Sequence, residues 1–228
     1  AISIEHFSKV HLLKVLQETE TSGSQVVMEY VDQLDSKPRD ILKGDLEKNK
    51  NSLYCGNLCN KYIKSELYCP VWVFVEIVSF GQYLHFYEFC ANRSQGENQK
   101  ELLRRLYLMR VVKDLRNACA HNNCIINDLR ARMNRKPNKE MQKVFVSLGF
   151  SKEMRSRHLK RVALYQIITT LYAHKEIVVS SGVHDNIARK LRELNTRFYR
   201  DRDYSKNGII KKSFNLLSTI FDKWFSIS

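Results

Sequence analysis

Residues 70–90 read PVWVFVEIVSFGQYLHFYEFC, and this stretch decides the fold class. The β-branched residues at its start would suit a buried strand. However, the apolar pattern continues from Val71 to Cys90 with Gly81 as its one turn residue, which is too long for an ordinary strand. Pro70 suits the first turn of a helix because its missing N–H costs nothing there. We therefore expect one buried helix over this stretch.

The rest of the chain also has helical spacing. Ile4, Phe7 and Val10 recur at intervals of three to four residues, as on one face of a helix. Only 3 Pro and 8 Gly punctuate the chain, too few for the many turns of a β-sandwich or barrel. Ser94 and Glu97 fit a capping box for the next helix. The sequence thus predicts an all-α fold, with further helices over 1–20, 26–34, 37–64, 98–115, 140–148, 156–175, 184–199 and 212–225.

The chain has no internal repeat, so we expect one helical domain over residues 66–228 with residues 1–65 as an attached N-terminal helical lobe. It starts at Ala1 with no initiator Met, which suggests a processed or truncated chain. The apolar stretch 71–89 contains Glu76 and Glu88, so it is not expected to span a membrane. No signal peptide opens the chain, and a cytoplasmic location is the expectation.

Charge is distributed unevenly along the chain. Residues 1–92 carry 9 Lys and Arg against 12 Asp and Glu, whereas residues 93–228 carry 29 against 12. Such a difference predicts an anionic partner, although a merely soluble basic surface is the alternative. Within Leu129–Arg161 there are 11 Lys and Arg and only 2 acids, which we interpret as an RNA-binding surface. Its expected RNA contacts are Arg130, Arg132, Arg135, Lys136, Lys139, Arg155, Arg157, Lys160 and Arg161.

The six cysteines are expected to be free, buried small side chains. Cys55, Cys59, Cys69 and Cys90 do not have the Cys-x2-Cys spacing of a zinc ribbon. The run from Cys119 to Cys124 could hold a metal only by consuming His121. We therefore expect neither a metal nor another cofactor.

The run Arg116-Asn117-Ala118-Cys119-Ala120-His121 contains the groups that RNA cleavage needs. A base must take the 2′-hydroxyl proton, an acid must protonate the leaving 5′-oxygen, and cations must offset charge on the phosphorane. His suits either proton transfer, and Arg pairs with two phosphate oxygens at once. Arg116 and His121 lie about 140° apart around a regular helix. They can meet at one phosphate if Arg116 lies in the first turn of a helix, where the helix end would itself favour the phosphate, or if two chains contribute.

Three sequence blocks support a family resemblance: LRNACAHN at 115–122, WVFVEIVSFG at 72–81 and IEHFSK at 4–9. Together they resemble the Abi-like proteins of prokaryotic phage defence, the AbiD/AbiF group, within the HEPN superfamily of helical ribonucleases. The resemblance covers most of residues 1–127. Proteins of this group normally carry a tyrosine-rich helical portion upstream of the Ile-Glu-His element, which this sequence lacks.

The resemblance implies a HEPN-type helical bundle with additional helices, which forms a homodimer in which two Arg-Asn-x3-His motifs meet. It implies a metal-independent endoribonuclease that acts as a toxin or abortive-infection effector. Arg116, Asn117 and His121 are then the catalytic residues. Glu76 is expected to be a buried carboxylate that pairs with Arg116 or another cation.

The expected partner is RNA, as substrate and also as an antitoxin or guide-like noncoding RNA, with a protein antitoxin left open and no DNA expected. Two alternatives to an enzyme remain. The chain could be an Abi-like protein that grips a structured RNA without cleaving it, or a dimerisation scaffold.

Overall fold

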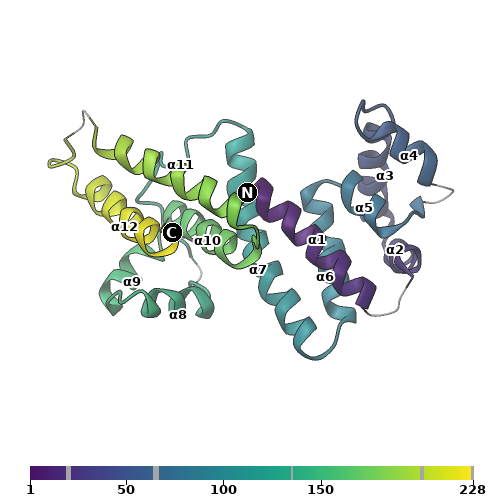
Figure 1. Cartoon of the computed structure of the whole chain (residues 1–228), viewed down its shortest axis with the longest axis horizontal. Coiled ribbons are helices and arrows are strands. Elements are labelled where there is room, and N and C mark those ends of the chain that lie inside the picture. The colour runs from purple at the N-terminus through teal and green to yellow at the C-terminus, as the bar shows by residue number, and fades with distance from the viewer. Residues whose placement is uncertain (19–21, 64–66, 135, 201–202, 227–228) are drawn as a thin grey trace. The chain divides into compact units, whose positions relative to one another are not determined.

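The computed structural model describes residues 1–18, 22–63, 67–134, 136–200 and 203–226. Across these residues the regular structure is helical, with twelve α-helices and no strand (Figure 1). The one departure within the described chain is an isolated antiparallel bridge between Arg132 and Arg161. No described helix is both long and apolar enough to cross a membrane. The predicted all-α class is confirmed.

The chain divides into two compact units. The N-terminal unit comprises Ile2 and residues 4–110, and the C-terminal unit comprises residues 111–228 with Ala1 and Ser3. The boundary falls inside helix α7 (Gly96–Ala120), which contributes to both units. Residues 111–228 hold 24 Lys and Arg against 10 Asp and Glu, so they carry the whole net charge of +14. The expected division at residue 65 remains a prediction.

The N-terminal unit packs around aromatic residues. Tyr30, Phe74 and Phe86 are buried, with ring centroids 4.8–5.8 Å apart. They join α2 to α5 and α6, while α3 contacts α4 and α5. The helices preceding α7 in this unit are α1 (Ile2–Glu18), α2 (Gly23–Asp32), α3 (Ser36–Lys50), α4 (Gly56–Tyr62), α5 (Val71–Ile77) and α6 (Phe80–Arg93).

The prediction of one continuous helix from Val71 to Cys90 is wrong. Val78 adopts an extended conformation and ends α5. The Ser79 hydroxyl accepts a hydrogen bond from the Gln82 amide at 3.4 Å and so caps the start of α6. Ser94, expected to cap α7, instead donates its hydroxyl to the Cys90 carbonyl at the end of α6. Ser79 therefore caps the start of α6 and Ser94 caps its end, because short polar side chains readily hydrogen-bond to nearby backbone groups.

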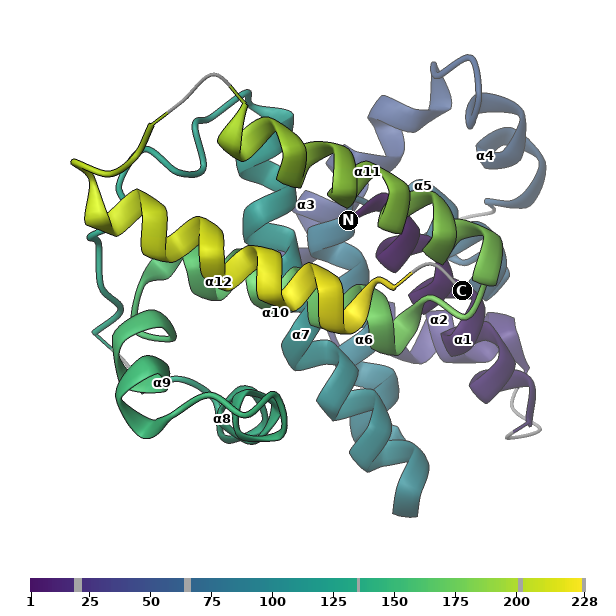
Figure 2. The ribbon, with the colours of Figure 1, turned by 60° about the vertical axis from the view of Figure 1, so that its left-hand side comes forward.

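The C-terminal unit contains the end of α7 and five further helices. Helix α12 packs against α10 and α11, which Figures 1 and 2 show from two sides. In this unit the helices after α7 are α8 (Lys139–Ser147), α9 (Lys152–His158), α10 (Val162–Ile177), α11 (Ser181–Tyr199) and α12 (Gly208–Trp224).

The helix predicted over 156–175 is also interrupted. Helix α9 ends at His158 and α10 begins at Val162. Between them the chain pairs with residues 131–133: the Met133 amide donates to the Lys160 carbonyl at 2.8 Å, and the Val162 amide to the Ala131 carbonyl at 3.0 Å. The two paired segments are far apart in sequence, and their pairing is the reason that the helical pattern is broken there.

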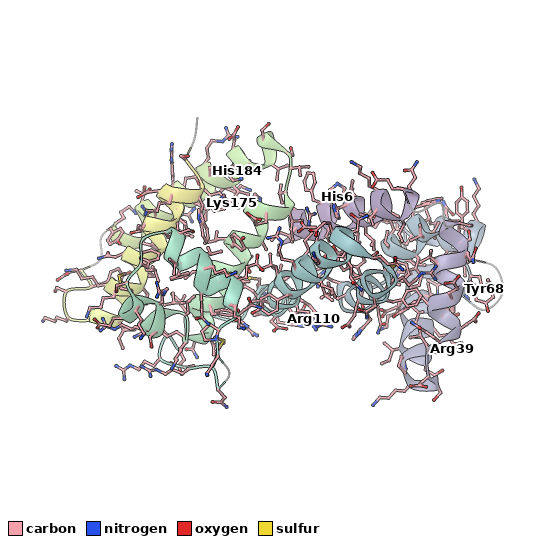
Figure 3. The ribbon with its side chains drawn as sticks, turned by 90° about the horizontal axis from the view of Figure 1, so that it is seen from below. His6, Arg39, Tyr68, Arg110, Lys175 and His184 are labelled. Atoms are coloured by element: carbon pink, nitrogen blue, oxygen red, sulfur yellow. The ribbon has the colours of Figure 1, made fainter. Side chains whose placement is uncertain are left out.

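Two histidines lie against the end of the chain in the C-terminal unit. His184 of α11, labelled in Figure 3, stacks on Phe225 with ring centroids 4.9 Å apart. His174 of α10 is buried beside both rings, and neither of its ring nitrogens has a hydrogen-bond partner among the described residues. Burial, followed by the proximity of His184, lowers the pKa of His174 to about 4. This histidine is therefore a neutral core residue at neutral pH.

Candidate functional site

The Arg-Asn-x3-His run lies at the C-terminal end of α7. Arg116 and Asn117 belong to its last turns, and the helix ends at Ala120. The His121 amide still donates to the Asn117 carbonyl at 3.1 Å, so His121 is the residue that closes the helix. The expectation that Arg116 could lie in a first turn is therefore wrong.

A left-handed residue fixes this helix end. Asn122 has φ of +54°, a conformation that Asn tolerates better than other non-glycine residues. Its amide donates to the Cys119 carbonyl at 3.0 Å, and the Asn123 amide donates to the Ala118 carbonyl at 2.9 Å. These two hydrogen bonds form a Schellman motif. The backbone that carries His121 is thus held from both sides.

The three motif side chains lie at the protein surface. Arg116 is half-buried, and its Nη1 donates to Oδ1 of Asn117 at 3.2 Å. Asn117 and His121 are exposed. Asn117 therefore orients the guanidinium group, while the His121 imidazole makes no hydrogen bond to any part of the chain that the structure describes. A histidine with a packing role would instead be buried.

The end of the helix also sets an electrostatic condition. A helix C-terminus has partial negative charge, which disfavours a phosphate by about 0.3–1 kcal/mol. A phosphate at this site must therefore be held by cations. Arg116 is one, and the remaining charge has to come from the basic part of the unit.

Glu76 does not have the environment that was expected. It is exposed on α5, and it makes no ion pair with any residue among those described. Trp72, one helical turn earlier, is 42% exposed, so positions 72 and 76 share an outward face. The prediction of a buried, paired carboxylate is wrong because Val73, Phe74 and Ile77 provide the inward face instead.

The predicted RNA contacts divide into free and engaged side chains. Arg155 is half-buried and donates to the Phe150 carbonyl at 3.1 Å, and Arg157 pairs with Glu153 on α9. Arg161 is half-buried. Arg135 lies outside the described residues. The exposed members of the set are Arg130, Arg132, Lys136, Lys139 and Lys160.

Three of the predicted RNA contacts line a pocket of about 420 Å³. The bridge between residues 132 and 161 brings the start and the end of the basic segment together, so that Arg130, Arg157 and Arg161 line one cavity. Lys206 and Lys212, on either side of the start of α12, complete its basic wall. Neither lysine was predicted as part of the site, because this helix was expected to begin at residue 212, whereas it begins at Gly208. The dipeptide Asn207-Gly208, a strong turn signal, marks the true start.

The charges around this pocket perturb their neighbours. Burial, followed by the positive charges of Arg132 and Arg157, lowers the pKa of Arg161. His158 is buried at the end of α9. Burial lowers the pKa of this histidine to about 4, with Arg161, Arg157 and Lys212 acting in the same direction. His158 is therefore neutral at pH 7 and adds no further charge to the pocket.

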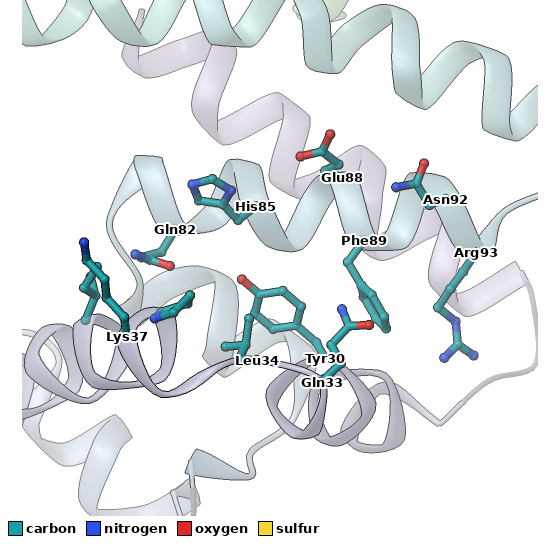
Figure 4. Close-up of a pocket in the computed structure, with 12 residues that line it drawn as sticks. Tyr30, Gln33, Leu34, Lys37, Gln82, His85, Glu88, Phe89, Asn92 and Arg93 are labelled. Atoms are coloured by element: carbon teal, nitrogen blue, oxygen red, sulfur yellow. The ribbon is translucent and has the colours of Figure 1, made fainter.

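A larger, mostly apolar pocket lies in the N-terminal unit between α2, α3 and α6 (Figure 4). Its volume is about 610 Å³, and Tyr30 and Phe89 lie along it. Two of its polar residues are already paired: Glu88 with Arg110 at 2.6 Å, and Arg93 with Glu29. None of the predicted site residues lines this pocket.

All six cysteines are free, as predicted, but only Cys59, Cys69 and Cys90 are buried. Burial raises the pKa of Cys69 to about 12, so this thiol is unreactive at neutral pH. Cys119, within the motif, and Cys124, three residues after it, are exposed. Within the described residues no three His, Cys, Asp or Glu side chains are grouped so that they could hold a metal ion.

These features define a basic, all-helical protein with an exposed Arg-Asn-x3-His helix end. A family model described as "Abi-like protein" matches residues 2–127, more than half of the chain. The chain therefore belongs to the Abi-like protein family, which associates it with abortive infection. The matched region includes the motif and ends before Arg130. Comparisons with curated proteins and with solved structures gave no match.

Proposed function

We propose that this Abi-like protein is a metal-independent endoribonuclease of the HEPN type, acting as a toxin or abortive-infection effector. The observation that carries the proposal is the exposed motif: Arg116, oriented by Asn117, lies on the same helix end as an imidazole that has no structural partner among the described residues. Membership of the Abi-like family supports the biological context.

In the proposed reaction the 2′-oxygen of the RNA attacks its own phosphate. A histidine takes the 2′-hydroxyl proton, the new bond joins O2′ to phosphorus, and the bond to O5′ breaks. A second histidine donates a proton to the leaving 5′-oxygen. Because each motif supplies one histidine, two chains with His121 facing one phosphate provide both the base and the acid. The two Arg116 guanidinium groups then offset the charge on the phosphorane.

The basic C-terminal unit supports RNA as the substrate. The exposed side chains of Arg130, Arg132, Lys136, Lys139 and Lys160 follow the motif along the chain. Arg130 lies nine positions after His121, so these two lie at most about 30 Å apart. We propose that one RNA strand contacts both, with the basic surface compensating for the unfavourable helix end.

The experiment compares the purified parent chain with His121→Ala and with His85→Ala, a matched change of an exposed histidine on α6. The proposal predicts RNA cleavage by the parent and by His85→Ala, and none by His121→Ala with unchanged helical circular dichroism. RNA binding without cleavage by the parent would support the non-catalytic RNA-binding alternative. A parent that dimerises but neither binds nor cleaves RNA would support the scaffold alternative.

A further inference from the structure

The basic pocket at the start of α12 is separate from the motif and outside the region that matches the family. Its charged lining residues are Arg130, Arg157, Arg161, Lys206 and Lys212, and no acidic residue lines it within the part of the chain that is described. Only Arg157 has a carboxylate partner there, Glu153 on its own helix. Five cations facing one cavity repel one another, and this repulsion is relieved when an anion binds.

Two sets of hydrogen-bond donors on the residues that line this pocket have no acceptor within the described chain. Nη1 of Arg161 is buried and has no acceptor among the described residues. At the start of α12, the Asn207 side chain accepts from the Ile210 amide, but the amides of Gly208 and Ile209 have no acceptor within the described chain. The first amides of a helix point outwards and carry partial positive charge, which suits a phosphate oxygen.

The space fits a group larger than a bare ion. A volume of about 420 Å³ lies in the range of ligand pockets, and the side of Ile209 adds an apolar surface among the charges. A Cβ atom added to Gly208 would meet nothing within 4 Å, so the backbone there is open to a close approach. A phosphate with its attached ribose satisfies both the charge and the volume.

We propose that this pocket binds a nucleotide phosphate group, held by Arg161, Lys212 and the first amides of α12. That the phosphate belongs to RNA rests on the proposed function, in which the motif cleaves RNA. The pocket would then fix the position of the RNA relative to His121. Burial is the main cause of the lowered pKa values of Arg161 and His158, and the neighbouring positive charges of the pocket act in the same direction.

The test uses Trp72→Phe protein, in which Trp224 is the remaining tryptophan and reports on the C-terminal unit. Thermal unfolding is followed while inorganic phosphate replaces chloride at constant ionic strength in the low millimolar range. The Trp72→Phe protein, which is the parent for the variants below, should show a saturable rise in Tm as phosphate is added. Arg161→Gln/Lys212→Gln should weaken the apparent phosphate affinity about tenfold or more, because it removes two charge-assisted contacts.

The matched control is Arg189→Gln/Lys211→Gln, which removes the same charge from two exposed residues outside the pocket. It should respond to phosphate as the parent does. If the first variant does not fold, Lys206→Gln/Lys212→Gln, at two exposed positions, takes its place. Equal phosphate responses in parent, pocket variant and control would overturn the proposal, as would a parent that responds no more to phosphate than to chloride.

RNA oligonucleotides distinguish the sources of the phosphate. Equal binding of 5′-hydroxyl and 5′-phosphate forms, both competed by inorganic phosphate, assigns the pocket to the RNA backbone, and binding of the 5′-phosphate form alone assigns it to the RNA end. The pocket variant should also lower the salt slope of RNA binding by about 0.7 per lost contact. His121→Ala should keep the phosphate response, so a failure of the nuclease proposal leaves this result unchanged.

Discussion

Replacing Asn122 with valine tests how the helix end positions the motif. Asn122 has φ of +54°, and its amide and that of Asn123 close α7. A β-branched residue strongly resists this left-handed conformation. The substitution therefore either strains the backbone or opens the cap that holds His121.

The two outcomes have similar costs. Keeping the left-handed conformation costs about 1–2 kcal/mol for an ordinary L-residue. Opening the cap releases this strain but loses two backbone hydrogen bonds, each worth about 0.5–1.5 kcal/mol net. The folded variant adopts whichever of these two states has the lower free energy, so we expect Asn122→Val to lower the free energy of unfolding by about 1–2 kcal/mol. Asn122→Gly should be neutral or slightly stabilising, because glycine adopts this conformation freely.

Urea unfolding of the Trp72→Phe protein, followed by Trp224 fluorescence, measures these differences in the C-terminal unit. The matched control is Asn123→Val, the same change one residue later at an exposed position without a positive φ. It should change the unfolding free energy by less than about 0.5 kcal/mol. Equal stability of the Asn122→Val and Asn123→Val proteins would refute the reasoning.

Two further predictions concern pH and assembly. His158 and His174 have folded-state pKa values of about 4, below the ordinary 6.5, so the unfolded chain takes up protons first as pH falls. The C-terminal unit should therefore lose stability between pH 6.5 and 4, by up to about 1.4 kcal/mol per pH unit for each histidine, and keep it above pH 6.5. Urea midpoints at pH 7 and 5 should differ less in His174→Phe, and a flat profile in the parent would contradict the two pKa values. For assembly, light scattering should give the mass of a dimer, as a two-fold shared site requires, and a fully active monomer would contradict that site.

The sequence predicted the helical class and most helix positions, because apolar spacing reports which faces are buried. It failed where a polar residue or a distant segment interrupts a helix. Ser79 splits the stretch 71–90 by capping a new helix, and Lys160 leaves the helical pattern to pair with Met133. Neither event changes the spacing of apolar residues, so periodicity cannot reveal it.

The candidate site was predicted in part. Arg116, Asn117 and His121 lie together on one exposed helix end, but spacing alone did not indicate which end. Glu76 was misassigned because its apolar neighbours suggested burial on all sides, whereas it shares an exposed face with Trp72. The basic pocket depends on the pairing of residues 131–133 with 160–162, and no local pattern encodes that contact.

The most direct test of the central claim is the chemistry of the RNA ends. Purified parent chain is incubated with a defined RNA in excess EDTA, and the products are analysed by mass spectrometry beside those of His121→Ala. We predict fragments with a 2′,3′-cyclic phosphate and a 5′-hydroxyl from the parent, none from the variant, and none when the RNA carries 2′-O-methyl groups. A strict requirement for Mg²⁺, products with a 3′-hydroxyl, or equal cleavage by His121→Ala would contradict metal-independent cleavage by His121.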